Sequence, residues 1–171
     1  MTMGWAWLIV LLATYPWVLG ADLASDALAS SSLIFFVSGA CVIAPCRRLR
    51  RWQSVLFAGA LGFLFEARLP VPDGLLAFFL VGLAIFLSSH RSWLRTTPRM
   101  LQAAAAANTL ACLCWAVGSA YQSGLGSELG VRLLPQLLFA WFAGAMAFIP
   151  VALTQNAVMD RLAVPPAPET P

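Results

Sequence analysis

The organisation of this chain is decided by residues 59–74, GALGFLFEARLPVPDG, which lie between two long apolar runs. Gly59, Gly62 and Glu66 are spaced i, i+3 and i+7, so a helix places them on one face. That face carries almost no side chain before it reaches the acid. We call residues 59–74 the acidic corner, and we expect the other helices to be arranged around it.

Two prolines and an Asp-Gly pair end the acidic corner. Pro70 and Pro72 stop the helix, because proline lacks a backbone N–H and clashes with the preceding turn. Asp73 and Gly74 are typical turn residues and lead the chain into the next apolar run.

Glu66 is the acid whose position is most informative. It follows Ser54 by about 18 Å of helix, which is less than the ~30 Å hydrocarbon core of a bilayer. An ionised carboxylate there is costly, so we expect it to be protonated, paired with Arg68 or Arg132, or held at a contact between helices. A locally thin membrane, with Glu66 at the interface, explains the sequence equally well. For a buried structural acid, Glu66→Gln should be tolerated and Glu66→Leu should be harmful.

The composition is that of an integral membrane protein. Of the 171 residues, 61% are hydrophobic and 10% are charged, and the mean hydropathy is +0.83. A soluble domain needs a charged surface, whereas the charges here are confined to short segments between apolar runs. The net charge of +3 is too small and too dispersed to indicate nucleic-acid binding.

Six apolar runs are candidate membrane spans by the rule that about 20 residues cross a bilayer. The sequence thus predicts an all-α, polytopic membrane protein with six transmembrane helices in a compact bundle, formed by a single domain over residues 1–160. Residues 161–171 are Pro-rich and should form a short disordered cytoplasmic tail. The predicted spans are Trp5–Gly20, Ala27–Ala44, Trp52–Leu69, Gly74–Ser89, Met100–Gln122 and Leu133–Gln155.

The arginines divide unequally between the predicted connections. Only Arg68 and Arg132 accompany the acids on one side, and the other eight of the ten lie on the opposite side or in the tail. The positive-inside rule makes the arginine-rich side cytoplasmic, and six spans then place both termini in the cytoplasm. These eight residues are Arg47, Arg48, Arg50, Arg51, Arg91, Arg95, Arg99 and Arg161.

No set of residues suited to catalysis or metal binding stands out. His90 is the only histidine, which excludes His-pair zinc motifs, and the four cysteines form no ligand set. The sequence also lacks a phosphate-binding loop, a nucleophile elbow and an acid cluster for Mg²⁺. We therefore expect a protein that is not an enzyme and that has no cofactor or metal site.

Small and polar residues in the last two spans indicate close helix packing. Asn108 follows five alanines and can hydrogen-bond across a helix contact, so packing and substrate contact are both open roles. The last span carries two small-xxx-small pairs, which suit a tight contact inside the bundle or with a partner, including a second copy of this chain. The pairs are Ala140 with Gly144 and Ala143 with Ala147, and Pro150 follows them.

Residues 62–74 resemble the rod-shape-determining protein family MreD. Its members tend to carry a Gly-rich third span that ends in an acid, usually Asp, then a proline six positions later and a glycine two further on. Glu66, Pro72 and Gly74 reproduce this spacing, with Glu in place of Asp. Length, span number and topology also match, but the usual Pro-Asp pair before the second span is replaced by Asp26-Ala27.

The resemblance implies a non-enzymatic, multi-pass protein of the bacterial inner membrane that takes part in cell-shape control and lateral-wall peptidoglycan synthesis. Its partners in this elongasome would be MreC-like proteins and, through them, the MreB filament and the peptidoglycan synthases. The alternative is a resemblance to the substrate-binding S components of energy-coupling-factor vitamin transporters. Such a protein needs an outward-facing pocket with several convergent polar groups.

Overall fold

The computed structural model describes residues 4–28, 30, 33–69, 72–123 and 129–164, with 123 and 129–132 as backbone only. Its regular structure is helical throughout, and the described residues contain no strand, so the all-α prediction is confirmed. The elements are α1 (Ala6–Ala27), α2 (Ser38–Arg48), α3 (Arg51–Glu66), α4 (Leu75–Ser89), the 3-10 helix η2 (Arg91–Arg95), α5 (Thr97–Ser123) and α6 (Leu129–Arg161).

Among the described residues, three helices are long and apolar enough to cross a membrane, and they indicate membrane insertion. They cover Ala6–Ala27, Thr97–Gln122 and Leu133–Arg161, and Leu75–Ser89 is a shorter apolar helix. The helices α2, α3 and α4 have 11, 16 and 15 residues, fewer than the about 20 that span a hydrocarbon core. Helix length therefore supports three spans, and the predicted number of six is not confirmed.

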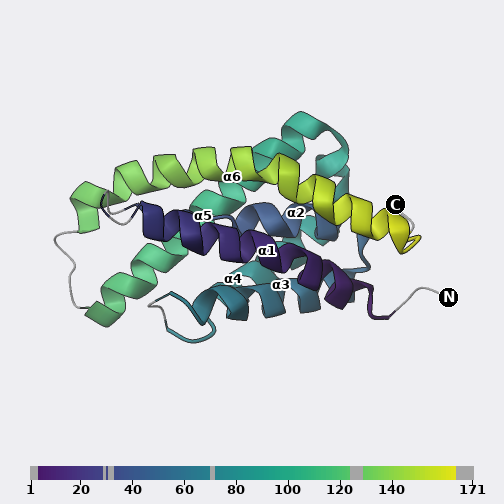
Figure 1. The fold of residues 1–171 in the computed structure, drawn as a ribbon, viewed down its shortest axis with the longest axis horizontal. Coiled ribbons are helices and arrows are strands. Elements are labelled where there is room, and N and C mark those ends of the chain that lie inside the picture. Colours follow the sequence, from purple (N-terminus) through teal and green to yellow (C-terminus); the bar gives the residue numbers. More distant parts are fainter. Residues whose placement is uncertain (1–3, 29, 31–32, 70–71, 124–128, 165–171) are drawn as a thin grey trace.

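The long helices run roughly along the long axis of the molecule (Figure 1). The helix α1 begins and α6 ends at one end of the molecule, whereas α5 ends and α6 begins at the other. Between them α2 contacts every other helix, and all its residues from Ser38 to Cys46 are buried. The centre of the bundle is therefore α2.

The second predicted span is wrong in its boundaries. The sequence predicts a helix over Ala27–Ala44, but α1 extends to the start of that range and α2 begins only at Ser38. Alanine and leucine in the last turns of α1 favour continued helix. Asp22 and Asp26, which the predicted spans place in the first connection, therefore lie within α1. Residues 33–37, LIFFV, are non-helical. β-branched and aromatic side chains such as these favour extended backbone.

Candidate functional site: the acidic corner and the polar contacts of the bundle

Glu66, the last residue of α3, caps the helix that follows it. Its Oε2 accepts a hydrogen bond from the backbone N–H of Gly74 at 2.8 Å, and its Oε1 accepts one from the N–H of Ala77 at 2.9 Å. Gly74 is the N-cap residue of α4 and has no side chain with which to cap it. The first N–H groups of a helix lack intrahelical partners and carry partial positive charge, so a carboxylate is favourable there. Glu66 thereby ties the end of α3 to the start of α4.

The helices α3 and α4 approach most closely at Gly62. A Cβ atom on Gly62 would lie 2.3 Å from the Cα of Ala77, so a larger residue would force the two backbones apart. A Cβ atom on Gly59 would lie 3.4 Å from Cγ2 of Val81, which is an ordinary van der Waals contact. Gly59, Gly62 and Glu66 all face α4, as their spacing predicts, but only Gly62 has to be glycine for packing.

The remaining residues of the acidic corner shape the turn. Gly74 has a φ of 90°, a left-handed conformation that residues with a Cβ rarely adopt. The carbonyl of Pro72 accepts a hydrogen bond from the N–H of Leu75 at 3.2 Å, and Asp73 is exposed. Pro70 lies outside the described residues.

Arg68 is not the partner of Glu66. It forms an ion pair with Asp22 of α1 and donates to the hydroxyl of Tyr15 at 3.4 Å. The side chain of Arg132, the other predicted partner, lies outside the described residues. Glu66 is only 8% exposed, so the structure supports the expectation of an acid held at a contact between helices.

A second group of polar side chains holds the non-helical residues 33–37. The amide of Gln136 in α6 pairs with the backbone of Ile34: its Oε1 accepts from the N–H at 3.1 Å and its Nε2 donates to the carbonyl at 2.8 Å. The Oγ of Ser25 accepts from the N–H of Phe35 at 2.9 Å. In a membrane, non-helical backbone is tolerated only where protein or water supplies its hydrogen bonds. These side chains replace the bonds that a continuous helix would have formed.

Asn108 joins the same segment to α5 and α6. Its Nδ2 donates to the carbonyl of Phe36 at 2.7 Å and to that of Ala140 at 2.8 Å. Two neighbouring helices approach Asn108 through glycine. A Cβ atom on Gly39 would lie 2.3 Å from the backbone nitrogen of Asn108, and a Cβ atom on Gly144 would lie 2.6 Å from the Cβ of Asn108. These are contacts of helix packing, one of the two roles that the sequence left open.

The small residues of α6 face the inside of the bundle. The side chains on the outer face are large: Phe142 is 66% and Met146 is 75% exposed. Pro150 is half-buried beyond them. The small-xxx-small pairs therefore serve contacts within this chain, which answers the question that the sequence left open. The buried members are Ala140, Ala143, Gly144 and Ala147.

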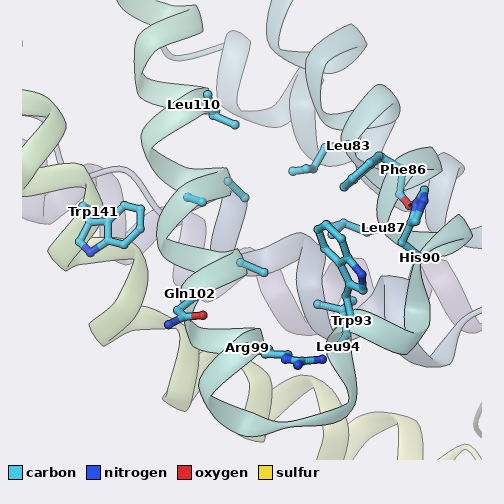
Figure 2. A pocket seen from close by; sticks show the side chains of 13 residues that line it. Leu83, Phe86, Leu87, His90, Trp93, Leu94, Arg99, Gln102, Leu110 and Trp141 are labelled. Carbon is cyan, nitrogen blue, oxygen red and sulfur yellow. Dashed lines mark hydrogen bonds between the residues drawn. The ribbon is translucent and has the colours of Figure 1, made fainter.

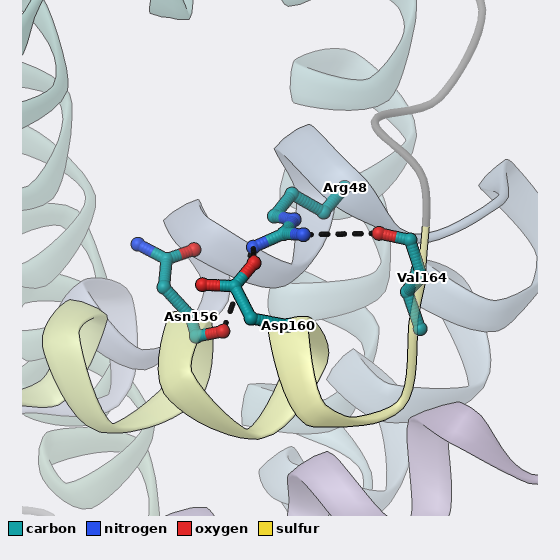
Figure 3. Close-up of polar contacts among 4 residues, drawn as sticks. All are labelled: Arg48, Asn156, Asp160 and Val164. Atoms are coloured by element: carbon teal, nitrogen blue, oxygen red, sulfur yellow. Dashed lines mark hydrogen bonds and ion pairs between the residues drawn. The ribbon is translucent and has the colours of Figure 1, made fainter.

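The arginines predicted to be cytoplasmic gather at one end of the bundle, which we call the arginine end. Arg48, at the end of α2, forms an ion pair with Asp160 of α6 at 2.6 Å and donates to the carbonyls of Asn156 at 3.5 Å and Val164 at 2.9 Å (Figure 3). Arg48 thus also fixes the end of α6. Two further arginines of this end form hydrogen bonds: Arg47 donates to the sulfur of Met100 at 3.6 Å, and Arg91 donates to the carbonyl of Leu49 at 2.5 Å. The exposed members of the arginine end are Arg50, Arg51, Arg95, Arg99 and Arg161.

Several polar residues that hold the bundle together are not predicted from the sequence. Gln155 is fully buried, and its Nε2 donates to the hydroxyl of Thr14 and to the carbonyl of Cys41, both at 2.9 Å. Gln136 and Ser25 hold the non-helical segment. Asn108 stands out as an uncharged polar residue within an apolar run. The same criterion applied to the last apolar run also identifies Gln136 and Gln155.

Comparison with known proteins gives no relative. No protein family, curated protein or solved structure matches the chain. Within the described ranges, no group of three His, Cys, Asp or Glu side chains is placed to hold a metal ion.

Proposed function

We propose that this chain is a non-enzymatic component of the bacterial machinery for lateral cell-wall elongation, similar to MreD and anchored in the inner membrane. The observation that carries the proposal is the hydrogen bond between Glu66 and Gly74. The MreD-like spacing places an acid eight positions before a glycine, and in this chain those two residues meet as the cap of α4. A spacing with a structural reason supports the resemblance more strongly than matching letters alone.

The proposed arrangement has six membrane crossings with both termini in the cytoplasm. The arginine end supports this orientation through the positive-inside rule. It is also the end at which α1 begins and α6 ends (Figure 1), as an even number of crossings requires. The short α2 can complete a crossing together with residues 33–37. Its 11 residues rise about 17 Å, and five non-helical residues can add at most about 17 Å, which together are enough for the ~30 Å hydrocarbon core.

In this proposal the protein acts by binding MreC-like partners and, through them, the MreB filament and the peptidoglycan synthases. The small residues of α6 are already used inside the bundle, so partners must contact exposed side chains or connections. The outer face of α6 carries large apolar side chains, which can face lipid or pack against another transmembrane helix through van der Waals contact. Those at least 65% exposed are Leu134, Phe142, Met146 and Leu153.

The experiment that tests the proposal is depletion of the protein in a rod-shaped bacterium that carries this chain. We expect round or swollen cells, and rescue by the wild-type protein. Gly62→Leu should fail to rescue because it separates α3 from α4, whereas Gly59→Ala is the matched control and should rescue fully. Membrane abundance of each variant is measured by immunoblot. Normal rod shape after complete depletion would overturn the proposal.

A second candidate function is vitamin binding, as in the S component of an energy-coupling-factor transporter. The observation that favours it is a cavity of about 610 Å³ at the end opposite the arginine end, lined in part by Asp22, Ser25, Asp26 and Arg68. Most of these polar groups already have partners, since Asp22 pairs with Arg68 and Ser25 binds the backbone of Phe35. A vitamin requirement with normal cell shape after depletion would favour this function over the first.

A further inference from the structure

A groove lies between α4, η2 and α5, at the arginine end of the bundle (Figure 2). Its volume is about 670 Å³. Several lining side chains are accessible from outside the bundle: Trp93 is 62% exposed, and Phe86 and Leu110 are 48% and 49% exposed. The groove therefore opens on the outer surface of the helices.

The chemistry of the groove changes along its length. Trp93, Arg99 and Gln102 line one end, and Figure 2 shows Arg99 reaching toward Trp93 across that end, with His90 beside Phe86 on the α4 side. Leucine, alanine and aromatic side chains line the rest, and Leu110 lies at the far end in the same view. One end can thus hold a polar, negatively charged group, and the remainder suits a hydrocarbon chain.

The length of the whole groove is close to that of one leaflet of a bilayer. Arg99 and Leu110 belong to the same helix, α5, and are eleven residues apart. At 1.5 Å per residue the groove extends about 17 Å along α5, close to half of the ~30 Å hydrocarbon core. An acyl chain whose headgroup lies at the membrane surface fits this length.

The charge around the mouth is positive and has no nearby acid in the sequence. Residues 74–127 contain no Asp or Glu, while residues 90–99 carry one histidine and three arginines. Within the described part of the chain, Arg99 takes part in no ion pair. Basic pockets between transmembrane helices on the cytoplasmic side are suited to anionic lipid headgroups, and each basic residue near the surface contributes about 1 kcal/mol.

The aromatic side chains fix the mouth. The Nδ1 of His90 lies 3.0 Å from the carbonyl of Phe86, so Nδ1 carries the hydrogen, and in the neutral ring Nε2 can only accept a hydrogen bond, for example from a headgroup hydroxyl. The ring of His90 packs against Phe86 at 4.7 Å, and Trp93 stands edge-on to Phe86 at 6.3 Å. Tryptophan at the membrane interface anchors a protein at the level of the headgroups.

We propose that this groove binds one anionic phospholipid, with its phosphate at Arg99 and one acyl chain along α5 toward Leu110. The observations favour a lipid over a partner helix because a cationic mouth and an apolar wall occur in one groove whose total length is close to that of one leaflet. The proposal requires only membrane insertion. It is independent of the role in cell-wall elongation.

The test is lipid binding to the purified full-length protein in detergent, measured by native mass spectrometry with phosphatidylglycerol and with phosphatidylcholine. Wild type should bind phosphatidylglycerol more tightly. Arg99→Gln should weaken phosphatidylglycerol binding about fivefold, the factor that corresponds to ~1 kcal/mol per basic residue, and leave phosphatidylcholine unchanged. The matched control is Arg51→Gln, an exposed arginine of the same end that does not line the groove.

A second pair of variants tests the acyl-chain site. Ala106→Trp fills the groove and should weaken binding of both lipids at least tenfold, whereas Val117→Trp, elsewhere on the exposed face of α5, should have no effect. If Ala106→Trp does not fold, Ala103→Leu is the smaller filling substitution at the same wall.

Three results would overturn the proposal: equal binding of both lipids by wild type, an equal loss in Arg51→Gln, or unchanged binding in the groove-filling variant. A photo-crosslinker at Leu110 that captures a protein in cells instead of a lipid would assign the groove to a partner helix. None of these results depends on cell shape, so this proposal can fail while the proposed function stands.

Discussion

Replacing Glu66 by glutamine tests whether the cap of α4 is made by a charged acid. Both carboxylate oxygens accept hydrogen bonds from backbone N–H groups, those of Gly74 and Ala77. Glutamine keeps one acceptor oxygen but brings an NH₂ group in place of the other, so a donor would face a donor. The structure therefore changes the expectation from the sequence, and Glu66→Gln should be destabilising.

The magnitude follows from the two bonds. A hydrogen bond to a charged group contributes about 1.5–3 kcal/mol, and a negative charge at a helix N-terminus contributes about 0.3–1 kcal/mol. Glu66→Gln loses one of the bonds and the charge, so the free energy of unfolding should fall by about 2–4 kcal/mol. Glu66→Leu leaves both buried N–H groups without a partner and should cost about 3–6 kcal/mol.

The assay is unfolding of the purified protein in mixed micelles by titration with sodium dodecyl sulfate, followed by the fluorescence of its seven tryptophans. The control is Asp73→Asn, which changes an exposed acid in the same turn and should alter the free energy of unfolding by less than about 0.5 kcal/mol. If Glu66→Gln is as stable as Asp73→Asn, the carboxylate is not the cap of α4 and the reasoning is refuted.

Three further changes test the packing and the orientation of the chain. Gly62→Ala should lower the free energy of unfolding by at least ~2 kcal/mol in the same titration, whereas Gly59→Ala should change it by less than ~0.5 kcal/mol; equal effects would contradict the close approach of α3 and α4. Gly144→Leu should cause unfolding or loss of membrane abundance, because Gly144 meets Asn108 inside the bundle. It should not release a partner from an intact protein, and blue-native electrophoresis can distinguish the two results. In a cysteine-free variant, a cysteine at Asp73 should react with an impermeant maleimide on intact spheroplasts, and one at Ser92 only after permeabilisation; the reverse pattern would invert the proposed orientation.

Local features of the fold could be predicted from the sequence because they depend on helix periodicity and composition. The spacing of Gly59, Gly62 and Glu66 places them on one face in any helix, and α4 lies against that face in the structure. The small residues of the last span indicate close packing for the same reason, since Gly144 meets Asn108 of α5. Neither pattern states which helix lies opposite, so the partner had to come from the structure.

Features that depend on distant residues could not be predicted in this way. The sequence gives no means to choose between Asp22 and Glu66 as the partner of Arg68, because the choice depends on how α1 packs against α3. The break before α2 was missed for a similar reason. Residues 33–37 are as apolar as a membrane helix, and the side chain that pairs with Ile34 comes from Gln136, 102 positions later.

Several buried polar residues of this chain share a structural task. Glu66 accepts hydrogen bonds from N–H groups at the start of α4 that have no partner within that helix, and Gln136 and Asn108 bond to the non-helical backbone before α2. A lipid environment offers no water to complete the hydrogen bonds of backbone that departs from regular helix. Side chains from distant parts of the chain therefore complete them, so tertiary packing holds the breaks between these helices in place.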